Sequence, residues 1–326
     1  MVTNASNDAA EQCEIASLSA NPRVARSAAI AYFGGRVGRH VNHNTMNQSY
    51  STSRRKLVLE AGRTERHYWG DLWAYRELFA VLAWRDVAVR YKQTVIGLAW
   101  ALIRPFITMV VFTLVFGKLA NLSSQVSAPY PIVVFAGMLP WFLFSTILSE
   151  ASNSIVSNTR LVGKVYFPRI IIPSSSALVA LIDFGINLFM LAGLMVWYGL
   201  LPTWRIVLLP GFVALTVLAS LGPALLITAL NVKYRDFRFV IPFIVQIGLY
   251  VSPVGFSSAL VPTQWRFLYG LNPTVGIIDG FRWCILGGEN QIYLPGFLLS
   301  LVVVVLLLWR GIMVFRRTER TFADFL

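Results

Sequence analysis

The sequence is poor in the residues that soluble enzymes and metalloproteins depend on. Only 13% of its 326 residues are charged and 56% are apolar, which is too hydrophobic for a soluble globular domain. It contains two cysteines, Cys13 and Cys284. Its three histidines all lie within the N-terminal tail. Because no Cys/His spacing typical of a metal site occurs, we expect neither a metal nor a histidine-centred active site.

Motifs that carry enzyme chemistry are also missing. The sequence contains no G-x-x-x-x-G-K-[ST] phosphate loop, no H-E-x-x-H and no G-x-S-x-G. We therefore expect that the chain is not an enzyme and binds no cofactor of its own. If it moves a solute uphill, the energy should come from a partner.

Six apolar stretches have the length of a membrane span. They cover about 99–119, 130–149, 172–199, 206–230, 239–256 and 294–315. Most of the 28 Lys and Arg fall in the two tails and in the connections 150–171 and 231–238. The exceptions are Lys118, Arg205, Arg266 and Arg282, which fall in connections on the opposite side of the membrane. Lys and Arg near span ends stay in the cytoplasm, so the pattern predicts an all-α, multi-pass inner-membrane protein with both termini cytoplasmic.

The net charge of +13 has a simple explanation in such a protein. Basic residues that fix topology also attract anionic lipid headgroups, so we expect membrane lipids as partners and no nucleic acid. Residues 1–68, rich in Asn, Ser, Ala and Arg, lack the apolar run of a signal peptide and are predicted to form a disordered cytoplasmic extension. The permease domain itself should cover 69–326.

The segment 71–95 is predicted to form an amphipathic helix before the first span. Its apolar face follows helical spacing and consists of Leu72, Tyr75, Phe79 and Leu82. Because Asp86 would continue this face, a bend near Trp84–Arg85 is expected. The tryptophans and basic side chains favour a helix in the cytoplasmic headgroup layer, and the alternative is packing on the protein's own cytoplasmic surface.

Between spans five and six, the apolar pieces of 252–293 are too short to cross a membrane. The pattern favours two short re-entrant helices with a corner at Asn272–Pro273, since proline disfavours helix at the preceding residue. A plain amphipathic outer loop is the alternative. A further short cytoplasmic helix is predicted around 157–165.

Polar residues within the spans are sparse. Asp183 and Asn187 lie four apart on one face of the third span. An ionisable residue inside a span suggests function. However, no basic partner is evident, so we favour a helix-contact or dimer-contact role over ion coupling.

Four motifs together resemble a known family. They are Trp84-Arg85-Asp86…Arg90-Tyr91-Lys92-Gln93-Thr94…Gly97…Trp100…Arg104-Pro105, Lys164-Val165-Tyr166-Phe167-Pro168-Arg169, Asn231-Val232-Lys233-Tyr234-Arg235-Asp236, and Phe315-Arg316-Arg317-Thr318-Glu319…Phe322-Ala323-Asp324. In this order they resemble the membrane subunits of type 2 ATP-binding cassette exporters, in the branch that exports O-antigen, capsular polysaccharide and teichoic acid. The tail resembles that of O-antigen permeases.

The resemblance implies a homodimeric permease that works with two copies of a separate ATPase subunit, which would use the ATP. The substrate would be a polysaccharide linked to undecaprenyl diphosphate, with O-antigen as the first expectation. An ion-coupled secondary transporter or lipid-linked sugar flippase is the competing class, but it would require buried charges and usually an inverted repeat.

For this function, three sets of residues follow from position and chemistry. The lipid diphosphate should contact the basic group Arg85, Arg90, Lys92 and Arg104 at the headgroup level, unless these residues only fix topology and bind anionic lipid. The polysaccharide conduit should be lined by Phe106, Phe112, Phe116, Phe243, Tyr250 and Phe256, although aromatics in spans usually pack or lie at interfaces. The ATPase should contact Glu150, Lys164, Tyr166, Phe167, Arg169, Tyr234, Arg235 and Asp236.

A fourth set should close the conduit at its outer end. A pore wide enough for a sugar chain would leak ions when empty, and apolar side chains seal a pore by excluding water. The predicted outer gate is the segment 257–290, with Trp265, Phe267, Leu268, Asn272, Pro273 and Ile277.

Overall fold

The computed structural model describes residues 68–92, 95–125, 128–164, 167–234, 236–287, 292–319 and 322. These residues form helices and connecting segments, with no strand among them. The predicted N-terminal extension, 1–68, lies outside the described residues except for Tyr68, which begins helix α3 (Tyr68–Ala74).

The chain divides into two compact units. The smaller one contains residues up to Leu78 together with Lys164–Pro168. The larger one, Phe79–Gly163 and Arg169–Leu326, holds all the long apolar helices.

Five helical segments in the described residues are long and apolar enough to cross a membrane. They are α5 (Val95–Phe112) continued by the π-helix η2 (Thr113–Leu119), α6 (Tyr130–Ser157), α8 (Ile171–Trp197), α9 (Leu209–Lys233) preceded by the 3-10 helix η4 (Trp204–Leu208), and α13 (Leu294–Glu319). Five of the six predicted spans are thus confirmed as long apolar helices. The remaining span, 239–256, contains α10 (Phe237–Val251), whose 15 residues rise only about 22 Å, less than the roughly 30 Å of a bilayer core.

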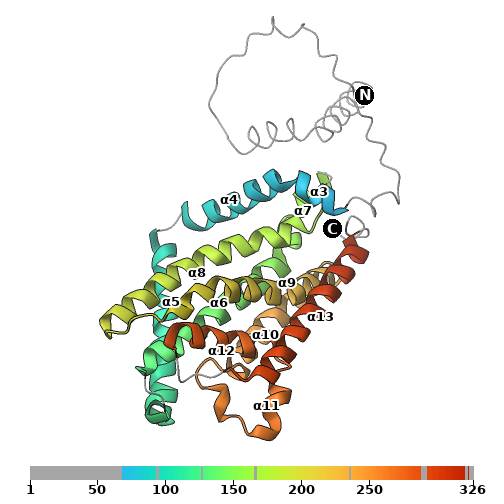
Figure 1. The fold of residues 1–326 in the computed structure, drawn as a ribbon. Helices are drawn as coiled ribbons and strands as arrows, with labels where there is room; N and C mark the ends of the chain where they lie inside the picture. The colour runs from blue at the N-terminus through green and yellow to red at the C-terminus, as the bar shows by residue number, and fades with distance from the viewer. Residues whose placement is uncertain are drawn as a thin grey trace, which may run out of the picture. The chain divides into compact units, whose positions relative to one another are not determined.

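Helix α6 is the centre of the larger unit. It packs against α8 and α9, and α9 packs in turn against α13 (Figure 1). In the most apolar stretch of α6, 83% is buried, whereas only 17% is buried in the corresponding stretches of α5–η2 and α13. The apolar side chains on α5 and α13 therefore face outward, as expected of helices that contact lipid.

Glycines let α9 and α13 approach closely. A Cβ added to Gly222 would lie 2.7 Å from the backbone nitrogen of Leu308, and one added to Gly311 would meet the backbone of Gly222. The crossing therefore depends on the absence of side chains at these two positions.

Helix α4 (Arg76–Lys92) runs without interruption, so the bend predicted at Trp84–Arg85 is wrong. Asp86 forms an ion pair with the neighbouring Arg85, Nη2 to Oδ1 2.7 Å, and this partner allows the carboxylate to stay on a continuous helix. Val81 and Val89 are exposed, as is Trp84, whereas Leu82 is buried. The short helix predicted around 157–165 is confirmed as α7 (Thr159–Lys164).

After α10 the chain forms η5 (Ser258–Leu260), α11 (Thr263–Tyr269) and α12 (Pro273–Leu286). Helices α11 and α12 confirm the two predicted short helices. The predicted corner is confirmed as well: Asn272 caps α12 by accepting a hydrogen bond from the backbone nitrogen of Thr274 at 3.1 Å. Helix α12 is mostly buried and contacts α6, α9 and α13. That these helices re-enter the membrane stays a prediction.

Candidate functional site

An ionic cluster joins α4 to the central helices. The Arg90 guanidinium lies 2.8 Å from the Asp183 carboxylate on α8 and 3.4 Å from the Glu150 carboxylate on α6. The Tyr91 hydroxyl donates a hydrogen bond to the same Asp183. Burial, reinforced by this hydrogen bond, raises the pKa of Tyr91 above its ordinary value, so the phenol stays a proton donor. Asp183 is thereby held by two neighbours on α4.

Arg85 makes a second attachment one and a half turns earlier. Its guanidinium donates hydrogen bonds to Asp86, at 2.7 and 3.0 Å, and to the side-chain oxygen of Asn158 at 2.8 Å. Asn158 is the C-cap residue of α6. Arg85 and Arg90 together therefore fix α4 to the C-terminal part of α6 and the middle of α8, in line with the alternative that this helix packs on the protein's own surface.

This arrangement changes how two predicted diphosphate ligands are understood. Arg85 is already paired with Asp86, and Arg90 with Glu150 and Asp183. Arg104 is exposed on α5, and the side chain of Lys92 lies outside the described residues. The structure also places Glu150, predicted at the ATPase contact, beside Arg90. The inference that Asp183 lacks a basic partner is wrong.

Two of the sequence motifs meet at the loop before α8. The Arg169 backbone N–H donates to the Glu319 carboxylate at 2.6 Å, and its guanidinium donates to the Glu319 carbonyl oxygen at 2.7 Å. The same guanidinium lies 5.8 Å from the centre of the Phe322 ring, which packs edge-on against Phe315. The C-terminal tail thus holds the loop.

Of the other residues predicted for the ATPase contact in this loop, Phe167 belongs to the smaller unit, whereas Tyr166 and the Lys164 side chain lie outside the described residues.

The second predicted coupling loop is anchored by a buried asparagine. Asn231 donates hydrogen bonds to the carbonyl oxygen of Ser152, at 2.9 Å, and to the side-chain oxygen of Asn153, at 3.2 Å. Tyr234 and Asp236 are exposed, as a contact surface requires, and Arg235 lies outside the described residues. The loop therefore presents its polar end from a fixed base on α6.

Three of the predicted conduit aromatics lie together. The Phe112 ring is centred 5.3 Å from that of Phe116 and 6.4 Å from that of Tyr250. Phe112 is buried, and a Cβ added to Gly255 would meet the Phe116 and Phe112 rings at 2.7 to 3.0 Å. These rings therefore pack against one another at the end of α10, with Phe112 buried and Tyr250 still exposed.

The other conduit and gate residues are dispersed. Phe106 and Phe243 are exposed on α5 and α10, and Phe256 is half-buried after α10. Trp265, Phe267 and Leu268 are exposed on α11, whereas Ile277 is buried in the core on α12. The structure does not bring the predicted gate residues into one apolar surface.

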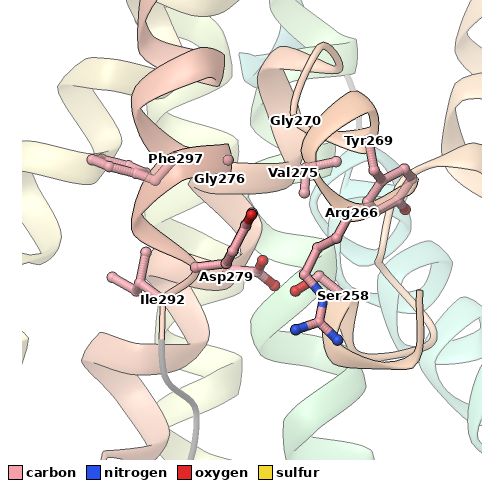
Figure 2. Close-up of a pocket in the computed structure, with 11 residues that line it drawn as sticks. Ser258, Arg266, Tyr269, Gly270, Val275, Gly276, Asp279, Ile292 and Phe297 are labelled. Carbon is pink, nitrogen blue, oxygen red and sulfur yellow. The ribbon is translucent and has the colours of Figure 1, made fainter. Parts of the chain in front are cut away.

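A polar pocket that sequence reasoning missed lies beside α12. Asp279 lines it from one side, with Ser258 and Arg266 facing it and Tyr269 also in the lining (Figure 2). Arg266 donates to the carbonyl oxygen of Ala259 at 2.7 Å, and its Nε is buried without a partner among the described residues. The pocket has room for about one water molecule. Asp279 lies seven residues after Asn272, so helical spacing could have placed the two on one face of α12.

Comparisons with known proteins identify relatives along most of the chain. Residues 77–286 match the ABC-2 type transporter family. The chain is 27% identical over 257 residues to an O-antigen export system permease protein RfbA of Myxococcus xanthus, covering 78% of this chain and 97% of the relative. An O-antigen export system permease protein RfbA of Klebsiella pneumoniae is 23% identical, with 77% and 95% covered.

A polysialic acid transport protein KpsM of Escherichia coli is 22% identical over 244 residues, covering 69% of this chain and 90% of the relative. The family match spans more than half of the chain and includes α4, the long helices up to α9, and the pair α11–α12. The chain therefore belongs to the ABC-2 type transporter family of membrane proteins.

Proposed function

We propose that this protein is the permease subunit of an exporter that carries a polysaccharide linked to undecaprenyl diphosphate, most specifically O-antigen, across the bacterial inner membrane. The observation that carries the proposal is the near full-length match to relatives named as O-antigen export permeases. The similarity to a polysialic acid transport protein supports the same substrate class. The absence of a phosphate loop from the sequence fits a transport subunit that relies on a separate ATPase.

Deletion of the gene in its own bacterium tests the proposal. We expect loss of surface O-antigen, seen as loss of the long-chain ladder of lipopolysaccharide, with lipid-linked polymer accumulating inside the cell. Complementation by the wild-type gene is the control. Unchanged surface polymer would refute an export role, and loss without internal accumulation would indicate a role in synthesis.

In the proposed assembly two copies of the permease join two ATPase subunits, with both termini in the cytoplasm. Six spans result if α10 and the residues after it count as the fifth. This topology keeps the basic connections 150–171 and 231–238 in the cytoplasm, as the distribution of Lys and Arg favours.

The ATPase should dock on the loops before α8 and before α10. Arg169 there is engaged by the C-terminal tail, so we assign it to holding the loop, while the exposed Tyr234 and Asp236 provide contact. Helix α4 is proposed to lie in the headgroup layer, with exposed Trp84, Val81 and Val89 toward lipid.

The lipid diphosphate should bind beside Arg104, in the middle of α5. Arg104 is exposed there. Unlike Arg85 and Arg90, it would not have to break an ion pair seen among the described residues in order to bind a phosphate. Arg85 and Arg90 would contribute only if the diphosphate displaced Asp86, Glu150 or Asp183 from them. We therefore expect charge removal at Arg104 to weaken binding of a short diphosphate-lipid analogue more than charge removal at Arg85.

The outer gate should lie in 257–290, with the exposed apolar side chains of α11 as its movable part. Trp265 and Leu268 are exposed, and the corner at Asn272–Pro273 separates them from the buried α12. In this proposal α12 is the fixed wall of the gate.

A further inference from the structure

The residues that follow α10 leave helical geometry while still buried. Ser252 and Val254 are almost completely shielded from solvent, and Pro253 and Gly255 are buried as well. The predicted fifth span, 239–256, needs this segment because α10 alone is too short. Non-helical backbone at membrane depth is tolerated only where protein or a water-filled cavity satisfies its polar groups.

Side chains from three other helices satisfy this backbone. The Tyr269 hydroxyl donates to the carbonyl oxygen of Val251 at 2.7 Å, and the Tyr130 hydroxyl donates to that of Gly255 at 2.5 Å. Arg282 donates to the carbonyl oxygens of Val254 and Phe256, both at 2.7 Å. The segment is thus held by side chains where a regular helix would hold itself.

Arg282 makes the largest number of these contacts. It is only 2% exposed, and its Nε donates a third hydrogen bond, at 3.2 Å, to the carbonyl oxygen of Val133 on α6. One side chain on α12 therefore links α6 to the end of α10. A Cβ added to Gly137 would lie 2.7 Å from Nη2 of Arg282, so the adjacent face of α6 is kept bare for the guanidinium.

The same segment is tied to the corner between α11 and α12. The Ser252 hydroxyl lies 2.9 Å from that of Thr274 and accepts a hydrogen bond from the Asn272 side chain at 3.1 Å. A movement of this corner would therefore pull on the end of α10, where Tyr250 and Phe256 lie.

We propose that Arg282 is a positioning residue that holds the outer end of α10 closed against α6 and α12. The proposal rests on the proposed export function, because the closed end is the seal of an empty conduit. A guanidinium bound to carbonyl oxygens forms a link that can be released and remade, since water in an opened conduit can replace each hydrogen bond. A continuous helix at this place would offer no such release.

Ion leakage through the purified full-length permease tests this role. The protein is reconstituted into liposomes without ATPase or polymer, and leakage of a small ion is compared between the wild type and Arg282→Gln. Loss of three hydrogen bonds should raise leakage by about tenfold or more. Arg282→Lys, which retains the charge, should restore part of the seal.

Lys118→Gln is the matched control, because it also removes one positive charge from the predicted outer side, but Lys118 is exposed on η2 and lies outside the proposed gate. It should leak like the wild type. An Arg282→Gln protein that elutes and melts like the wild type and yet seals equally well would overturn the proposal and leave the export assignment intact. Equal leakage from Lys118→Gln would also overturn it, since the effect would then not be specific to Arg282.

A second measurement keeps Arg282 unchanged. With Phe256→Cys, a membrane-impermeant thiol reagent added outside should react slowly at rest and faster during ATP-driven export, while Cys284 is buried. Equal reaction rates in the two states would refute the closure of the end of α10 at rest, even if Arg282→Gln failed to fold. Loss of export on gene deletion, measured separately, decides the proposed function.

Discussion

Replacing Asp183 with asparagine should loosen the attachment of α4. Asp183 accepts a hydrogen bond from Tyr91 and pairs with Arg90 at 2.8 Å. Asparagine keeps the shape and an acceptor for Tyr91 but removes the charge, so the Arg90 guanidinium loses its closest anion. The expected result is a lower free energy of unfolding with the fold retained.

The magnitude follows from burial. The Asp183 side chain is 14% exposed and the Arg90 side chain is 39% exposed. Removing one partner of a fully buried ion pair costs about 3–5 kcal/mol, and an exposed pair contributes only about 0–1 kcal/mol. With Arg90 partly solvated, we expect an interaction energy of about 1–2 kcal/mol. The Glu150 side chain, 54% exposed and 3.4 Å away, should contribute less than about 0.5 kcal/mol.

A double-mutant cycle measures both values. Asp183→Asn, Arg90→Gln and the double variant are unfolded in mixed micelles of mild detergent and dodecyl sulfate, and Glu150→Gln replaces Asp183→Asn in the control cycle. The reasoning would be refuted if the effects of Asp183→Asn and Arg90→Gln on the free energy of unfolding added up to that of the double variant within about 0.3 kcal/mol. A larger coupling at Glu150 than at Asp183 would also refute it.

Three further predictions concern packing and coupling. Gly311→Ala should destabilise the protein by about 1–3 kcal/mol, because its methyl group would strike the backbone at Gly222, whereas Gly185→Ala meets nothing within 4 Å and should be neutral or slightly stabilising in the same micelle assay. Glu319→Gln should weaken the link between the tail and the loop before α8 and lower export at unchanged protein level; full export would contradict a holding role. Asp236→Ala should reduce export and co-purification of the ATPase but not membrane insertion, and normal co-purification would remove Asp236 from the docking surface.

Local patterns in the sequence determined the all-helical, multi-pass architecture. Long apolar stretches must form helices to satisfy their backbone in lipid, and this makes spans such as α6 and α13 readable without any contact information. The corner at Asn272–Pro273 was equally local, because proline restricts itself and the residue before it. The family motifs depend only on residue order, and the comparisons agree with them.

Only the tertiary structure decided which polar groups are partners. Asp183 and Arg90 are 93 positions apart, and Arg282 reaches Val133 across 149, so no helical or strand period could pair them. Burial also separated side chains that looked alike in the sequence, since Ile277 lies in the core whereas Leu268 is exposed. An apolar residue is compatible with lipid, core or conduit, because all three are apolar environments, and only packing chooses among them.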